Sequence, residues 1–348
     1  MDLIHKKIER YLKKSVASNY PYNMVTNEIS NIERSAIYYK YTLGNIDGMV
    51  IFVGGEKFFY FENAKNRATL TKFQTKLNER SCPPPFYLVG KGDFKSRYKN
   101  LKSNDDFNNL IFSIFTAEKM ATIYNQIICN SDSLAPHKST IFESMEAYWL
   151  GMDYISTDSL MSVMEGALRN LIHKAGKERP NLKFQNYIRS LAIDRVSVYF
   201  DKLNEFYWYP FKCNNFQTAL EQRGTDEELK LWVLIDHSMD AINAFLIWFS
   251  EVLYKNHDGS EDIFTLNRHN FFHAFSERDA IPVYYPLMLW SLLSLVYMES
   301  LFVKIRDPFF PETTKYDEKL GEYFSGLMND VGLNRRKVAR VYGVKYEI

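Results

Sequence analysis

The segment from residue 36 to residue 62 alternates between apolar or aromatic positions and polar ones, with the period of two that β-strands require. Glycines separate the alternating runs, at residues 44–48 and 54–55, where reversing turns are favoured. The pattern predicts an antiparallel meander with strands at residues 37–41, 49–53 and 57–61. A helix with one apolar face precedes the meander, and a further strand is expected at residues 86–89, after three consecutive prolines.

From residue 105 onward the apolar positions recur every three or four residues, which is the period of a helix with one buried face. A polar break at residues 130–136 interrupts the pattern, and two prolines within residues 307–311 end it, because proline cannot continue a helix. Two short helical patterns follow in the basic tail. The predicted helices after the break cover residues 142–155, 158–175, 183–205, 227–255, 266–277 and 286–306.

These patterns predict a mostly α protein with an amino-terminal α+β domain that contains a small antiparallel sheet. The predicted domains are an α+β domain of unknown role at residues 1–130, a helical domain at 139–306 and a basic helical tail at 307–348. Residues 280–298 carry no charge over a length close to that of a membrane span. Because Pro282, Pro286 and several hydroxyls interrupt this stretch, we expect a buried helix that begins near Pro286, and no membrane partner.

Composition narrows the class of protein. With 348 residues, 46% of them hydrophobic and 16% aromatic, the chain is long and apolar enough for two globular domains. Cys82, Cys129 and Cys213 are few and far apart, which fits a reducing compartment and disfavours disulfides or a zinc cluster. The amino terminus lacks the apolar core of a signal peptide, so we expect a cytoplasmic protein.

The net charge of +1 excludes strong bulk attraction to nucleic acid, so RNA binding would need local basic patches. Three patches are candidates, although solvated surface is the commoner role of such runs. They are Lys6, Lys7, Arg10, Lys13 and Lys14; Lys91, Lys95, Arg97, Lys99 and Lys102; and Arg335, Arg336, Lys337 and Arg340. Residues 90–96 have some likeness to a phosphate loop, but Phe94 occupies the place of a required glycine, and a basic loop is predicted there instead.

One short run concentrates polar chemistry between long apolar stretches. Residues 267–273 read Asn-Arg-His-Asn-Phe-Phe-His. Imidazoles can give and take protons near neutral pH, and a guanidinium presents donors that fit a phosphate. With RNA, whose own 2′-hydroxyl can attack the neighbouring phosphorus, a base, an acid and a cation suffice, so no cofactor and no metal are expected.

The run from Arg268 to His273 resembles the R-X4-6-H signature of the HEPN superfamily, many members of which are metal-independent RNA endonucleases. The resemblance extends upstream, where the aromatic stretch 148–154 leads into residues 164–171, which are similar to the Glu-x-x-x-Arg helix of defence-associated members. It covers about half the chain, roughly residues 139–304. It implies a HEPN-like helical bundle, RNA as partner and a toxin or antiviral defence role, with an inhibitor or sensor protein as a possible further partner.

Five residues along a regular helix rotate by about 140°, so Arg268 and His273 would leave one helix on nearly opposite sides. Either Asn267 caps the helix so that Arg268 lies in its first turn, or a second copy supplies the missing groups. The resemblance favours the second arrangement, because HEPN domains typically dimerise with both motifs lining one cleft. We therefore expect a homodimer.

The predicted roles follow from this chemistry. His273 is the general base or acid and Arg268 holds the scissile phosphate. His269, Asn267 and Asn270 are supporting residues, and Glu165 is expected to pair with Arg268 or with Arg169. The alternatives are a non-catalytic HEPN-like scaffold, in which Arg268 and Glu165 form a structural pair, and a nucleotide-sensing module. His269 and His273 also have metal-ligand spacing, but Asn270 stands where a zincin needs glutamate.

The aromatic run at residues 206–211 could stack bases, although packing of a loop between helices is the simpler interpretation.

Overall fold

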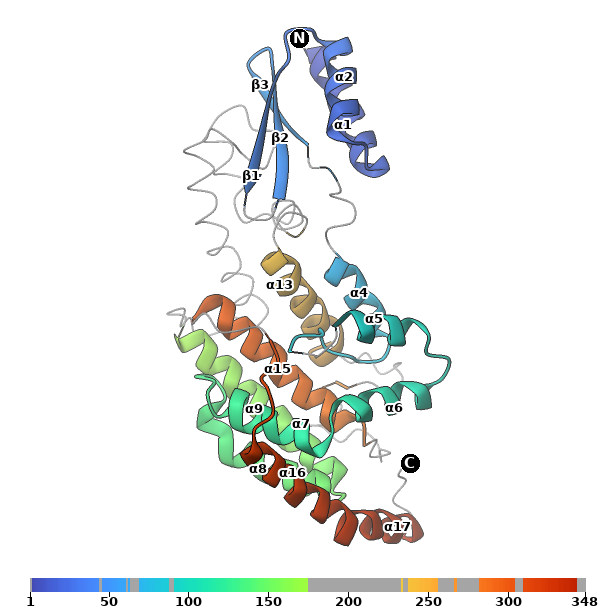
Figure 1. The fold of residues 1–348 in the computed structure, drawn as a ribbon, viewed down its shortest axis with the longest axis vertical. Coiled ribbons are helices and arrows are strands. Elements are labelled where there is room, and N and C mark those ends of the chain that lie inside the picture. The colour runs from blue at the N-terminus through green and yellow to red at the C-terminus, as the bar shows by residue number, and fades with distance from the viewer. Residues whose placement is uncertain are drawn as a thin grey trace. The chain divides into compact units, whose positions relative to one another are not determined.

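The computed structural model shows a mostly helical protein with a small antiparallel sheet near the amino terminus (Figure 1). It describes residues 2–43, 46–60, 62, 69–87, 91–174, 233, 237–255, 266–267, 282–303 and 309–342. These residues group into two compact units, those within 1–73 and 188–244 and those within 74–187 and 245–348. Residues 74–130 thus group with most of the predicted helical region. The segment 183–205, the aromatic run 206–211 and all but two residues of 266–277 lie outside the described residues.

The first unit is built on the predicted meander. Strands β1 (Ile37–Leu43), β2 (Ile46–Val53) and β3 (Glu56–Tyr60) pair antiparallel in the order β1-β2-β3. Gly54 and Gly55 turn the chain between β2 and β3 with φ values of 55° and 84°, which glycine adopts without strain. The prediction of three strands is confirmed, and so is the glycine turn at residues 54–55. Of the turn predicted at residues 44–48, residues 46–48 belong to β2 instead, and residues 44–45 lie outside the described residues.

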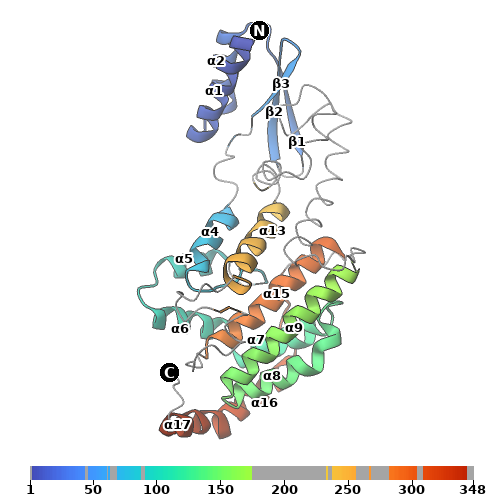
Figure 2. The same ribbon diagram turned by 180° about the vertical axis from the view of Figure 1, so that it is seen from behind.

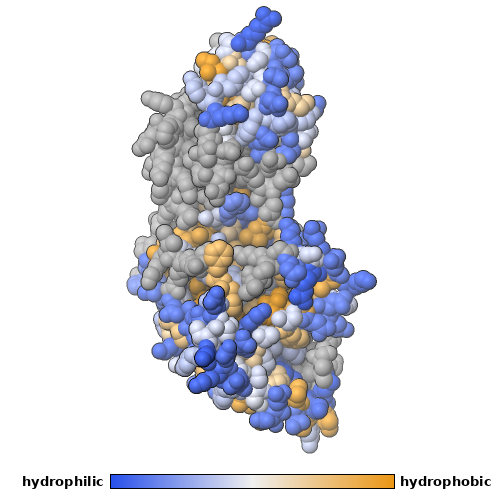
Figure 3. Space-filling model, in the orientation of Figure 1, coloured by the Kyte–Doolittle hydropathy of each residue, from blue (hydrophilic) through white to orange (hydrophobic). Residues whose placement is uncertain are grey.

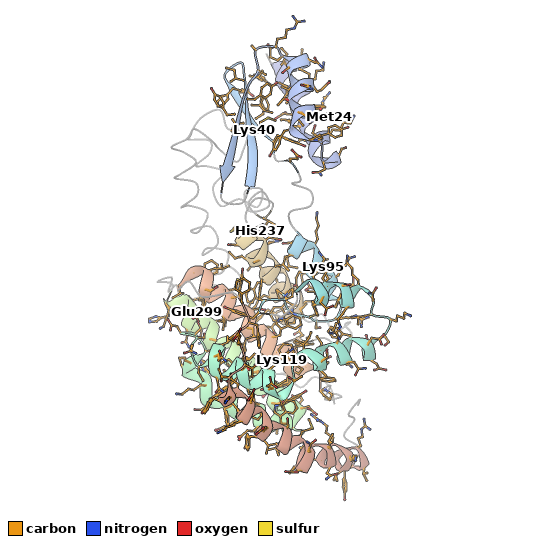
Figure 4. The ribbon with its side chains drawn as sticks, viewed as in Figure 1. Met24, Lys40, Lys95, Lys119, His237 and Glu299 are labelled. Carbon is orange, nitrogen blue, oxygen red and sulfur yellow. The ribbon has the colours of Figure 1, made fainter. Side chains whose placement is uncertain are left out.

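Two helices, α1 (Asp2–Ser18) and α2 (Tyr22–Ile32), pack against one face of this sheet (Figure 1). Alternation places every second strand residue on that face, where it meets the apolar stripes of the helices. Lys40 on β1 lies 5.6 Å from the centroid of the Tyr22 ring (Figure 4). The buried core consists of Ile8, Leu12, Val25, Ile29, Met49, Ile51, Val53, Phe58 and Tyr60.

A buried carboxylate joins two helices that are far apart in sequence. Helix α4 (Thr69–Asn78) begins with backbone N–H groups of Leu70 and Thr71 that donate to Asp240, over 3.0 and 2.9 Å. Asp240 lies on α13 (His237–Trp248) and is 3% exposed. The carboxylate satisfies N–H groups that a helix start cannot pair internally.

All regular elements in the described part of the second unit are helical. Its core helix α15 (Tyr284–Phe302) lies beside α9 (Asp153–Lys174) in both views of the ribbon (Figures 1 and 2). The other elements are α5 (Lys91–Lys99), α6 (Asn104–Ile114), α7 (Ala117–Thr122), α8 (Lys138–Trp149), α16 (Lys315–Leu327) and α17 (Leu333–Val341), with π-helical segments η1 (Ile123–Ile128), η3 (Phe249–Leu253) and η4 (Met328–Gly332) and a short 3₁₀ turn, η2 (Ala135–His137).

Helix α15 is the one described helix long and apolar enough to cross a membrane, and 78% of its most apolar window is buried inside the protein. Its residues from Tyr284 to Val296 are all buried, including Trp290 and Tyr285. This agrees with the predicted buried helix near Pro286. A helix that is apolar on all sides fits a position in the middle of a core.

Two local predictions are wrong. Residues 91–99 form helix α5 where a basic loop was expected, because Phe94, placed against Trp290 with ring centroids 5.3 Å apart, anchors one side of the helix. Phe86 and Tyr87 form a turn where a strand was expected to begin, and Phe86 stacks on Tyr297 at 4.1 Å between ring centroids. In both places an aromatic contact with α15 decides the conformation.

Elsewhere in the described part of this unit the helical pattern is confirmed, with shifted ends. Helix α8 stops at Trp149 because Gly151 turns the chain with a φ of 77°. Helix α9 then begins at Asp153, five residues before its predicted start. The two helical patterns of the tail are α16 and α17.

Candidate functional site

Two of the six residues predicted for the site are described by the structure. Glu165 lies on α9, and Asn267 lies in a short described segment with Leu266. Arg268, His269, Asn270 and His273 lie outside the described residues.

Asn267 is a buried amide with a backbone partner. It is 1% exposed, and its Nδ2 donates to the carbonyl oxygen of Lys255 over 2.9 Å. The preceding residue, Leu266, is fully buried, and its N–H donates to Oγ of Ser81 over 3.1 Å. A buried polar group without a partner would cost free energy, so these bonds fix the residues that lead into the motif.

Glu165 lies on the face of α9 that meets the end of a neighbouring helix. The hydroxyl of Tyr254 donates to Oε1 of Glu165 over 3.4 Å. The Tyr254 ring stacks on Phe249 with centroids 4.3 Å apart, which fixes its direction. Tyr254 follows η3, the π-helical segment that continues α13 (His237–Trp248), whose first residue is labelled in Figure 4. A π-helical turn at such a place shifts the residues after it around the helix axis, and such turns recur at functional sites.

Glu165 and Asn267 therefore contact consecutive residues, Tyr254 and Lys255. They are 102 positions apart in the chain by their residue numbers, 267 − 165, yet one helix end holds both. Sequence reasoning missed Tyr254, Lys255 and Ser81. The only signal was that the predicted helix 227–255 ended there.

One turn along α9 from Glu165, a histidine that sequence reasoning also missed packs against the helix. Nε2 of His137 lies 3.3 Å from Nδ2 of Asn170, which also donates to the carbonyl of Ser133 over 3.1 Å. Gly166 makes room for the ring, since a Cβ at this position would lie 2.6 Å from Cε1 of His137. Burial lowers the pKa of His137 below its ordinary value of 6.5.

This shift predicts a fall in stability at acid pH. The folded protein binds a proton at His137 less readily than the unfolded chain, so the free energy of unfolding should decrease as the pH falls below about 6.5 and level off below the folded pKa. Urea unfolding between about pH 7.5 and about pH 5 measures the effect. His137→Gln should flatten this part of the profile, whereas the exposed control His237→Gln should not. Equal profiles for wild type and His137→Gln would contradict the assignment.

Two other buried carboxylates of this unit, Glu299 and Asp317, stabilise the fold through hydrogen bonds. Glu299 on α15 is fully buried and accepts from Ser131 Oγ and from the N–H groups of Asp132 and Ser133, over 2.7, 3.0 and 2.8 Å (Figure 4). These hydrogen bonds fix the backbone within residues 130–136, where a polar break between helices was predicted. Asp317 caps α16; burial opposes its ionisation, but hydrogen bonds from Thr314, Asn125 and Gln126 outweigh burial and lower its pKa.

The third basic patch predicted from sequence is only partly a surface. Arg336 is buried and forms a bidentate pair with Asp153, Nε to Oδ2 at 3.0 Å and Nη2 to Oδ1 at 2.6 Å. Arg335 donates to the carbonyl of Gly151. Lys337 and Arg340 are exposed. The helix period turns neighbouring basic residues to opposite sides, so a run of arginines in sequence does not give a single basic face.

Among the described residues no group of three or more His, Cys, Asp or Glu side chains could hold a metal ion. A small open hollow, with a volume of about 30 Å³, lies in the second unit. Its lining is Tyr87, Ile114, Phe115, Lys119, Ile123, Leu293 and Phe310, which is mostly apolar, with Lys119 as the charged member (Figure 4). This lining differs from the convergent polar groups by which a nucleotide is recognised.

No family model, curated protein or solved structure matches this chain.

Proposed function

We propose that the chain is a metal-independent RNA endonuclease of the HEPN type. One observation supports this most: the buried Asn267, which directly precedes Arg268 in the sequence, is bonded to the same helix end that contacts Glu165. Those two residues come from the two segments that carry the family resemblance. These tertiary contacts thus support a common site for the segments around Glu165 and Asn267, whose proximity the sequence alone did not indicate.

In this proposal His273 moves the proton between the 2′-hydroxyl and the leaving oxygen, and Arg268 stabilises the charge that develops on the phosphate. The 2′-oxygen forms a bond to phosphorus while the bond to the 5′-oxygen breaks. The products are a 2′,3′-cyclic phosphate and a 5′-hydroxyl end. His269 and Asn270 orient the substrate, and the buried Asn267 positions the segment before Arg268 through its bond to Lys255. Glu165, held by Tyr254, positions the guanidinium or a neighbouring donor.

The same proposal includes a homodimer, whose two motifs share one cleft, acting in the cytoplasm as a toxin or defence effector under the control of an inhibitor or sensor. The dimer rests on the HEPN resemblance. It would also meet the helix geometry, because one regular helix would direct Arg268 and His273 to nearly opposite sides. Light scattering of the full chain gives the mass directly. A monomer that cleaves RNA would remove the need for a shared cleft.

The deciding experiment incubates the purified full chain with total RNA and a metal chelator. Cleavage that yields 2′,3′-cyclic phosphate ends, with no cleavage of DNA of the same sequence, is expected because DNA lacks the internal nucleophile. Cleavage that stops with the chelator, or that acts equally on DNA, would contradict the mechanism. Stable RNA binding without cleavage would favour the scaffold alternative.

A further inference from the structure

The outward face of α1 is strongly basic and is not used by the proposed chemistry. Lys6, Lys7, Arg10, Lys13 and Lys14 are all exposed, against two acidic residues in the whole helix, Asp2 and Glu9. At 100° per residue the five cations fall within an arc of about 120°. Figure 3 shows hydrophilic residues gathered on the side of the first unit where α1 and α2 lie.

The opposite side of α1 is fixed to the sheet. Ile8 and Leu12 are buried in the core, and Ser15 is fully buried. His5 is 5% exposed, with Nε2 3.1 Å from the carbonyl oxygen of Val53 and Nδ1 3.2 Å from a carboxylate oxygen of Glu56. Contacts made by the opposite face of α1 therefore fix the orientation of the helix, and with it the direction in which the basic face points.

We propose that this face of α1 binds the phosphate backbone of a single-stranded nucleic acid. The stretch from Lys6 to Lys14 rises about 12 Å along the helix. A stacked strand presents a phosphate about every 3.4 Å, so this length faces roughly three or four phosphates. With a net charge of +1 on the chain, the attraction comes from this local arrangement and not from the bulk charge.

An anionic membrane would also complement the charge of this face, but the positions of the apolar residues in α1 favour a nucleic acid. An interfacial membrane helix inserts its apolar face into lipid. In α1 that face packs against the sheet, and the basic arc contains one large exposed apolar side chain, Leu3 in the first turn, besides the small Ala17. Phosphate contacts need no insertion, since they are made by cationic side chains at the surface.

The binding is independent of the proposed cleavage and can be measured without it. The probe is a fluorescent oligothymidylate, which carries the phosphate backbone but no 2′-hydroxyl, so the proposed reaction cannot consume it. The test variant of the full chain combines Lys7→Gln, Arg10→Gln, Lys13→Gln and Lys14→Gln. The matched control, with the same loss of four charges, combines Lys138→Gln, Lys315→Gln, Lys319→Gln and Lys337→Gln, all exposed and all in the second unit.

If three of the four cations each neutralise a phosphate, the slope of log affinity against log salt should fall by about 2 and binding should weaken roughly 100-fold near 0.1 M salt. The control should keep most of the wild-type slope. Equal losses in both variants, or wild-type binding that does not depend on salt, would overturn the proposal. The proposal would also be overturned if the test variant lost binding to phosphatidylserine vesicles but kept wild-type binding to oligothymidylate.

Folding of the variant is checked by circular dichroism, and glutamine is a good helix former. Two half variants, Lys7→Gln with Lys13→Gln and Arg10→Gln with Lys14→Gln, provide a second measurement. Each should lower the salt slope by about half the effect of the full set. A half variant that folds and binds with the wild-type slope would contradict the assignment for its residues.

Discussion

Arg268→Ala and His273→Ala should each reduce the rate of RNA cleavage by about a thousandfold or more, while the free energy of unfolding changes little. The reason is that each group acts mainly in the transition state: the guanidinium on the developing phosphate charge, the imidazole on the moving proton. Cleavage is measured with a short RNA in the presence of a chelator, and unfolding with urea on the same preparations. The double variant should be hardly slower than either single one, because groups that act as a unit lose their effect together.

The control variants are Arg340→Ala and His237→Ala, which remove the same two kinds of side chain from exposed positions. Both should cleave RNA at the wild-type rate. Activity that survives Arg268→Ala and His273→Ala would end the proposed mechanism. An equal loss in the controls would show that the loss is not specific to the two motif residues.

Asp153→Ala is expected to destabilise the second unit by about 3–5 kcal/mol, which is the usual cost of leaving a buried charge without its partner. The side chain of Asp153 is 0% exposed and that of Arg336 is 10% exposed, so water cannot replace the lost contacts. The guanidinium of Arg336 also lies 5.7 Å from the Tyr148 ring centroid and donates to the Tyr148 carbonyl. Without the carboxylate these contacts are insufficient, and α17 should detach from the turn between α8 and α9.

Hydrogen exchange of α17 measures this detachment, and urea unfolding gives the free energy. Arg336→Ala should have a similar effect, because it leaves the buried Asp153 unpaired. The double variant should lose less than the sum of the two, as expected for residues in direct contact. Lys337→Ala, on the exposed side of the same helix, is the control. Additive losses, or unchanged exchange in α17, would show that the pair does not hold the helix.

Most of the fold follows from short-range patterns. The alternation at residues 36–62 and its glycines predicted the three strands, and the uncharged stretch after Pro282 predicted the buried α15. The errors arose where a local pattern competed with packing. Residues 90–96 look like a loop because glycine and charge dominate, yet Phe94 meets Trp290 and a helix forms. Phe86 has the side chain of a strand residue, but it stacks on Tyr297 after three prolines.

For the candidate site, the sequence indicated the type of chemistry, and the structure showed which residues contact Glu165 and Asn267. Arginine and histidine at 268–273 indicate phosphate and proton chemistry by residue type alone. That Asn267 bonds to Lys255, and that Tyr254 reaches Glu165, could not be predicted, because neither contact leaves a periodic trace in the sequence.

Outside residues 86–99, sequence by itself determined which of the described segments are strands or helices, which of their faces are apolar, and which residues carry reactive groups. These properties depend on neighbours within a few positions. Only the tertiary structure decided the partners: Asp240 capping α4 from 169 residues away, and Arg336 closing on Asp153 across 183. A carboxylate or a guanidinium can satisfy many partners equally well, so its choice depends on which surfaces the packed core brings together.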